Sequence, residues 1–288
     1  MASSSMKDIK KRIGSIKGTR QITKAMELVS SSKLLKARQQ IANSREYHLA
    51  ISNEMAKILS RNIDTQSPYF NGRPKIRKSC YVVIAGDRGL AGGYNNNVFR
   101  YLQDEIGDKD RESVCIIPIG RKATEYYSNR NFEIVTKEFF RVDEIDVGSC
   151  HEIAGLITNL YCKEEFDEVF IVFTHFVSLL SQQPAMVKIL PLDESIKRDT
   201  GEKSTEYLLI EPGSDVVFNA LVPSFIAGML WGSVNESLTS EHAARRVAME
   251  SASKNAEEII EDLSRQYNRA RQGSITQELT EIIAGSGM

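Results

Sequence analysis

Two long stretches of this chain contain neither glycine nor proline. Residues 19–67 form the first stretch and residues 233–272 form the second. Because glycine and proline are the residues that most disfavour a helix interior, each stretch predicts one long α-helix. At 1.5 Å of rise per residue the first helix would be roughly 70 Å long, whereas an ordinary globular helix has about 11–12 residues. The length of these two helices is the strongest constraint on the fold.

Apolar residues form a narrow stripe along each predicted helix. They recur mostly at steps of three or four, which places them on one helical face, and charged or polar residues fill the other faces. A stripe this narrow needs a partner helix, so we expect an antiparallel coiled coil, because one helix enters the middle of the chain and the other leaves it. The stripes are Ile9, Ile13, Ile16, Ile22, Met26 and Val29 in the first helix and Ala252, Ala256, Ile259, Leu263, Tyr267 and Ala270 in the second, and Ala25 and Ala37 are further small residues expected at the seam.

The middle of the chain alternates between strand-like and helix-like segments. This alternation predicts an α/β layer with a mostly parallel, Rossmann-like sheet. The last two strands, 168–176 and 185–192, are joined by a short link and are expected to be antiparallel. The expected domains are an N-terminal coiled-coil helix (1–67), a Rossmann-like α/β domain (68–212) and a C-terminal coiled-coil helix (213–288). The other expected strands are 80–86, 113–120 and 132–139, the expected helices are 94–106, 121–130 and 150–164, and 193–205 is an expected polar loop.

The net charge of -1 conceals an uneven distribution along the chain. Residues 1–61 hold 13 Lys and Arg against 4 Asp and Glu, whereas residues 62–215 hold 18 against 25 and residues 216–288 hold 6 against 9. A basic first segment on a nearly neutral protein indicates a local acidic partner. A nucleic-acid partner is the alternative, although no aromatic residue is interleaved with these basic residues before Tyr47.

Residues suited to catalysis or to metal and cofactor binding are few. The four cysteines form no CxxC pair, and none of the four histidines has a nucleophile or paired carboxylate at a meaningful spacing. The segment GDRGLAGGYN at 86–95 has the position of a phosphate loop, but its glycines lack the G-x-G-x-x-G spacing, which favours a structural turn over a nucleotide site. We therefore expect no catalytic residue, cofactor or metal.

Nothing in the sequence predicts a membrane-spanning or secretory segment. No uninterrupted apolar run approaches 18 residues, and the N-terminus lacks a hydrophobic signal core. The chain is therefore expected on the cytoplasmic side of a membrane.

Four segments resemble the signature segments of the gamma subunits of F-type ATP synthases. They occur in the family's order and extend over nearly the full length of the chain. They are IKKRIGSIKGTRQITKAMELVSSSKL (9–34), GDRGLAGGYN (86–95), SEHAARRVAME (240–250) and YNRARQGSITQELTEI (267–282).

This resemblance implies a rotating central stalk that has no active site of its own and couples proton or sodium flow to ATP synthesis or hydrolysis. The coiled coil would stand inside the alpha-beta hexamer, and the Rossmann-like domain would lie beside the epsilon subunit and the c-ring. The complex would sit on the cytoplasmic face of a bacterial cell membrane, and the chain would meet the membrane only through it. The implied contacts with the beta subunit are made by Lys24, Met26, Arg271, Gln272, Thr276 and Glu278.

Overall fold

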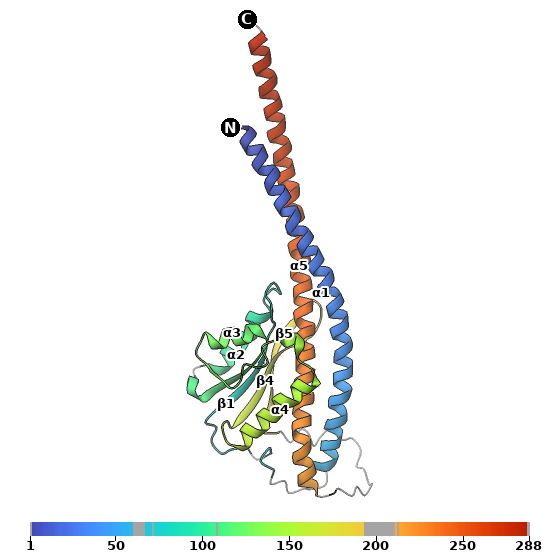
Figure 1. Ribbon diagram of the computed structural model, residues 1–288, viewed down its shortest axis with the longest axis vertical. Helices are drawn as coiled ribbons and strands as arrows, with labels where there is room; N and C mark the ends of the chain where they lie inside the picture. Colours follow the sequence, from blue (N-terminus) through green and yellow to red (C-terminus); the bar gives the residue numbers. More distant parts are fainter. Residues whose placement is uncertain are drawn as a thin grey trace. The chain divides into compact units, whose positions relative to one another are not determined.

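The computed structural model describes residues 2–59, 67–70, 72–107, 109–192, 211 and 213–286. The chain forms two compact units. The first, which we call the coil unit, contains residues 1–32 and 245–288, and the second, the sheet unit, contains residues 33–244. Helices α1 (Ala2–Leu59) and α5 (Ser214–Ser286) each contribute to both units (Figure 1).

A five-stranded sheet with the order β3-β2-β1-β4-β5 organises the sheet unit. The first four strands in this order are parallel, and β5 is antiparallel to β4, as the short link predicts. In chain order the strands are β1 (Ser79–Ile84), β2 (Val114–Ile119), β3 (Glu133–Ile134), β4 (Glu168–Phe176) and β5 (Gln182–Leu190).

Helices cover both faces of this sheet, as a parallel sheet requires. Side chains alternate along β1, so Tyr81 and Val83 pack with α2 and α3, whereas Cys80 and Val82 pack with α4 and α5. The covering helices are α2 (Tyr94–Ile106), α3 (Arg121–Ser128), α4 (Val147–Cys162) and the first part of α5, and two short 3₁₀ turns, η1 (Arg111–Ser113) and η2 (Val142–Glu144), lie in the connections.

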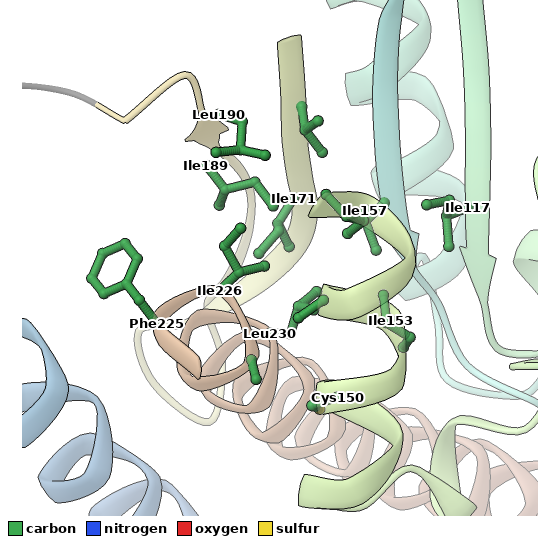
Figure 2. Packing of buried hydrophobic residues seen from close by; sticks show 14 of the residues in the cluster. Ile117, Cys150, Ile153, Ile157, Ile171, Ile189, Leu190, Phe225, Ile226 and Leu230 are labelled. Atoms are coloured by element: carbon green, nitrogen blue, oxygen red, sulfur yellow. The ribbon is translucent and has the colours of Figure 1, made fainter. Parts of the chain in front are cut away.

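The larger core lies between the sheet, α4 and α5. Figure 2 shows Ile153 and Ile157 of α4 beside Ile171 of β4 and Leu230 of α5, and each of the four has no exposed surface. Burying a side chain of this size contributes about 1.5–3 kcal/mol. This core fixes α5 against the sheet.

The apolar start of α5 corrects one expectation. Within Asp215–Gly285 an 18-residue window has a mean hydropathy of 1.5 with at most two charged residues, so by length and composition alone this helix could cross a membrane. Of the residues in this window, 44% are buried. They include Phe218, Val222 and Ile226, which pack in the core of the sheet unit. The absence of an uninterrupted apolar run was therefore too weak a reason to exclude a spanning helix.

The predicted fold class, an α/β layer combined with long N- and C-terminal helices, is confirmed. The second helix is longer than expected, because α5 begins at Ser214, contains Pro223 and continues through Gly232 and Gly273. The third strand is shorter than expected, with two residues in place of the segment 132–139. The expected loop at 193–205 lies outside the described residues, and the domain boundaries 1–67, 68–212 and 213–288 stay predictions.

Candidate interaction surface

The coil unit is an antiparallel pair of helices. Thr23 Oγ1 and Ser253 Oγ lie 2.7 Å apart, and Arg20 Nη1 lies 2.7 Å from Glu257 Oε1. A step of three residues toward the N-terminus of α1 thus corresponds to a step of four residues toward the C-terminus of α5, so the two helices run antiparallel. In Figure 1 these two helix ends lie side by side, with both chain termini toward the same end of the coil unit.

Burial along α1 identifies the seam and corrects the predicted stripe. Buried or half-buried side chains recur at residues 9, 13, 16, 20, 23, 27 and 30, the alternating steps of a coiled coil. Ile22 and Val29 are 63% and 58% exposed and lie outside the seam, where Thr23 and Ser30 are buried instead. The error arose in the gap of six residues after Ile16, where the apolar pattern shifts phase by one position.

The stripe on α5 agrees better with the seam. Ala256 and Leu263 are both 6% exposed, and Ala252, Tyr267 and Ala270 are half-buried. Ile259 is 43% exposed, and its neighbour Ile260 is half-buried in its place. Among the other small residues, Ala37 is 5% exposed, within the sheet unit, whereas Ala25 is exposed.

Lys24 lines an open groove of about 620 Å³ on the coil unit, whereas Met26, two residues further along the helix, lies on a different face of α1 and is not among the lining residues. The Lys24 ammonium donates to both oxygens of Glu27, at 2.9 and 3.1 Å, and keeps 59% of its side chain exposed. Met26 is half-buried, and its carbonyl accepts a hydrogen bond from Ser30. The groove is lined by Arg20, Gln21, Lys24, Ala25, Glu27, Leu28, Glu250, Ser253, Lys254 and Glu257.

The other four predicted contact residues form a separate patch. Arg271, Gln272, Thr276 and Glu278 are all exposed on α5, and Thr276 Oγ1 donates to the Gln272 carbonyl at 2.9 Å. Arg271 is 18 residues beyond Ser253, about 27 Å along the helix. The structure therefore separates Lys24 and Met26 on α1 from these four residues on α5.

The end of α5 carries an apolar surface that the sequence analysis missed. Four large apolar side chains there are 46–70% exposed. Their spacing continues a helical stripe, and this spacing was the signal that could have revealed them. An exposed apolar patch on a helix tip is typical of a surface that contacts another protein. The four residues are Ile275, Leu279, Ile282 and Ile283.

The loop at 86–95 has the contacts of a structural turn. The Gly86 amide donates to Asn95 Oδ1 at 2.8 Å, and the Asp87 carboxylate accepts from the amides of Arg121 and Val142. A Cβ at Gly86 would lie 2.8 Å from the buried Glu241 carboxylate. A carboxylate at this position repels a phosphate, so the geometry disfavours nucleotide binding here.

The histidines make local contacts. His151 Nε2 lies 3.3 Å from the Tyr47 hydroxyl, and His175 Nδ1 lies 2.5 Å from Glu236 Oε2. Burial lowers the pKa of His48, which favours its neutral form. In the part of the chain that the structure describes, no three His, Cys, Asp or Glu side chains gather as metal ligands would.

Comparisons with known proteins cover nearly the whole chain. The family model described as ATP synthase matches residues 5–287. The chain is 40% identical over 288 residues to the ATP synthase gamma chain of Ruminiclostridium cellulolyticum, covering 98% of this chain and 97% of that one. It is 41% identical over 285 residues to the gamma chain of Alkaliphilus metalliredigens, with the same coverage. It is 35% identical over 297 residues to the gamma chain, sodium ion specific, of Acetobacterium woodii, again with that coverage.

Solved structures support the same fold. The rotor of the Euglena gracilis mitochondrial ATP synthase, in rotational state 1, matches with a TM-score of 0.62 at 22% identity, covering 95% of this chain and 99% of that one. The central stalk and c-ring structure of the Tetrahymena thermophila mitochondrial enzyme matches with a TM-score of 0.60 at 21% identity, covering 81% and 99%.

Proposed function

This chain belongs to the ATP synthase gamma chain family, and from this premise we propose that it works as the rotating central stalk of an F-type ATP synthase. Rotation of the stalk would couple proton or sodium flow through the membrane sector to ATP synthesis or hydrolysis by the alpha-beta hexamer. The observation that supports this most directly is the coil unit, a two-helix rod with exposed charged and apolar patches and a seam that contains polar residues.

The stalk would act as an asymmetric ligand and not as a catalyst. A binder shifts a conformational equilibrium only by the difference between its affinities for the two states. The coil unit presents different residues in different directions, because the groove beside Lys24 and the patch around Arg271 lie on different parts of the rod. Its orientation would therefore favour a different state in each of the three beta subunits, where the chemistry would take place.

The partners are proposed from the family, and the charge and exposure of the coil unit support two of them. The basic first helix and the apolar end of α5 suit the alpha and beta subunits, whose carboxylates would attract the basic residues. The sheet unit would meet the epsilon subunit and the c-ring. The shaft would then consist of residues 1–67 and 213–288, and the foot would consist of residues 68–212. The complex would sit on the cytoplasmic face of a bacterial cell membrane, and the chain would reach the membrane only through the complex.

Beta-subunit contacts are proposed for Lys24 at the groove, for Met26 two residues further along α1, and for the four exposed residues near the end of α5. Lys24 already pairs with Glu27, so a beta carboxylate would compete for an ammonium that is 59% exposed. Arg271 and Gln272 have polar side chains that are exposed to solvent. Thr276 and Glu278, which are also exposed, follow on the next turn.

Assembly with purified alpha and beta subunits tests this function. We expect a stable complex whose ATP hydrolysis drives rotation of a bead fixed to this chain, and no ATP hydrolysis by the chain alone. A chain that neither assembles with these subunits nor turns during hydrolysis would overturn the proposal. Salt-sensitive RNA binding by the isolated chain, in place of assembly, would favour a nucleic-acid role.

A further inference from the structure

One short segment of α5 buries an unusual number of polar side chains. Between residues 233 and 241 six polar side chains are at most 9% exposed, and all of them belong to the sheet unit. Burying a polar group costs free energy unless it finds a hydrogen-bonding partner, so such a cluster needs a structural reason. The six are Ser233, Asn235, Ser237, Thr239, Ser240 and Glu241.

Two of these serines bind the backbone of β4. The Thr174 amide donates to Ser237 Oγ at 3.1 Å, and the Ser240 hydroxyl donates to the Thr174 carbonyl at 3.1 Å. All three residues are at most 2% exposed. Because Ser237 and Ser240 are three residues apart, they lie on the same face of the helix and reach one strand residue together.

The neighbouring strands explain why Thr174 needs these hydroxyls. The described pairing of β1 with β4 ends at Val83 and Val172, two residues before Thr174. On the other side Thr174 is paired with Pro184 of β5, but the Thr174 amide and carbonyl both bind the serines and therefore face away from β5. The two serine hydroxyls therefore take the place of a strand partner for a buried backbone group.

The same face of α5 also contacts the end of β1 and the next residue of β4. A Cβ on Gly86, two residues after β1, would lie 2.8 Å from the Glu241 carboxylate, so any larger residue there would force this carboxylate to move. His175, next to Thr174, pairs with Glu236 at 2.5 Å. Polar groups of α5 thus contact the ends of two adjacent strands.

We propose that Ser237, Ser240 and Glu241 are positioning residues that lock α5 to the sheet against rotation about the helix axis. Apolar packing such as that of Leu230 holds α5 against the sheet, but the hydrophobic effect is non-directional and does not by itself select one rotational setting of the helix. Hydrogen bonds have a preferred direction and length, so the bonds at Thr174 define one rotational setting of α5. This inference rests on the proposed rotor function, in which torque on the sheet unit has to reach the shaft.

Torsional stiffness is the quantity that tests the lock. The full-length chain carrying Ser237→Ala and Ser240→Ala is assembled with its alpha and beta subunits, the hexamer is fixed to a surface, and a bead is attached to the exposed Cys162. At a nucleotide-free pause we expect the angular variance of the bead to rise about twofold, because directional contacts are lost while the apolar packing stays. Restoring the hydroxyls with threonine at both positions should recover most of the stiffness.

The matched control is Ser264→Ala. The Ser264 hydroxyl bonds to the carbonyl of Ile260 in its own helix and does not hold the sheet. An angular variance in the double variant equal to that of this control would overturn the lock. Failure of the unmodified assembly to rotate would instead count against the rotor function itself.

Two further measurements decide the case if the double variant does not assemble. Gly86→Ala disturbs the contact from the side of the sheet, because it displaces Glu241. This variant should also raise the angular variance of the bead. In the isolated Ser237→Ala chain, loss of one net hydrogen bond of about 1 kcal/mol predicts roughly fivefold faster hydrogen exchange of the Thr174 amide. Unchanged variance in Gly86→Ala, or unchanged exchange at Thr174, would refute the proposal.

Discussion

The coil unit and the sheet unit bury their residues to very different degrees. In the sheet unit whole strands such as β1 and β2 are buried along their length. In the coil unit the buried residues are confined to one seam, and two of those on α1, Thr23 and Ser30, are polar. The sheet unit therefore has a core that can stabilise it alone, whereas the coil unit gains most from a partner that surrounds it. Five predictions test this contrast, from the largest expected effect to the smallest.

Ile171→Ala should produce the largest loss of stability. Ile171 is fully buried between the sheet, α4 and α5, and truncating such a side chain costs about 2–5 kcal/mol. Leu263→Ala should cost less, because Leu263 is 6% exposed at a narrow seam whose neighbouring residues are mostly exposed. Urea unfolding of the isolated chain measures both values, and equal costs would break the contrast between the units.

Asp167→Asn tests the polar anchor of the sheet unit. Burial alone would raise the pKa of the Asp167 carboxyl, but hydrogen bonds from Arg73 and from the amides of Arg77 and Lys78 lower it to about 2. Since the folded pKa lies below the ordinary value of 3.8, the stabilisation is fully present above pH 3.8 and is lost as the pH falls through about 2. The difference corresponds to roughly 2 kcal/mol at neutral pH.

A pH series of unfolding curves measures this contribution. The wild-type chain should lose stability toward pH 2 more steeply than Asp167→Asn does. Asp262→Asn is the control, because Asp262 and its partner Arg265 are 62% and 76% exposed on the coil unit. If both variants showed the same pH dependence, the Arg73 and Asp167 pair would have no special role.

Arg271→Ala combined with Gln272→Ala should affect turnover and leave stability unchanged. Both side chains are exposed, so the isolated chain loses no packing, but the assembled complex would lose hydrogen bonds to the beta subunit. We expect ATP hydrolysis of the complex to slow roughly tenfold, equivalent to about 1.4 kcal/mol. Normal turnover would mean that these two positions are not partner contacts.

Met26→Lys should disturb coupling more than it disturbs the fold. Met26 is half-buried, two residues along α1 from Lys24, so under the proposed function a second ammonium there would meet carboxylates of the beta subunit. We expect the number of ions pumped per ATP to fall by about half, with the assembled complex intact. An unchanged ratio in reconstituted vesicles would contradict the proposed contact of Met26 with the beta subunit.

Glu257→Gln should have the smallest effect. Its ion pair with Arg20 crosses the coil at 2.7 Å, but both side chains are largely exposed, at 60% and 42%. A surface ion pair of this kind contributes about 0.2–1 kcal/mol and is weakened by salt. Thermal unfolding at low and high salt should show a small difference that disappears at high salt, and a large, salt-independent loss would indicate a more rigid coil than the exposures suggest.

Much of the architecture could be predicted because its signals are local. The absence of glycine and proline indicated the long helices, and the alternation of strand and helix segments indicated the parallel sheet. The basic first segment and the segments around Lys24 and Arg271 indicated where partners would bind. The exposed apolar end at Ile282 and Ile283 was missed because a stripe of isoleucine reads equally well as a buried face.

What the sequence determined by itself is therefore the type and order of the elements, since these depend on neighbours within a few residues along the chain. Only the tertiary structure decided that Thr23 and not Ile22 lies in the seam, because the phase of a helix is set by the partner that it faces. It also decided that Ser237 and Ser240 replace a missing strand beside Thr174. A hydroxyl finds such a partner only after distant segments have packed, and no local pattern records that geometry.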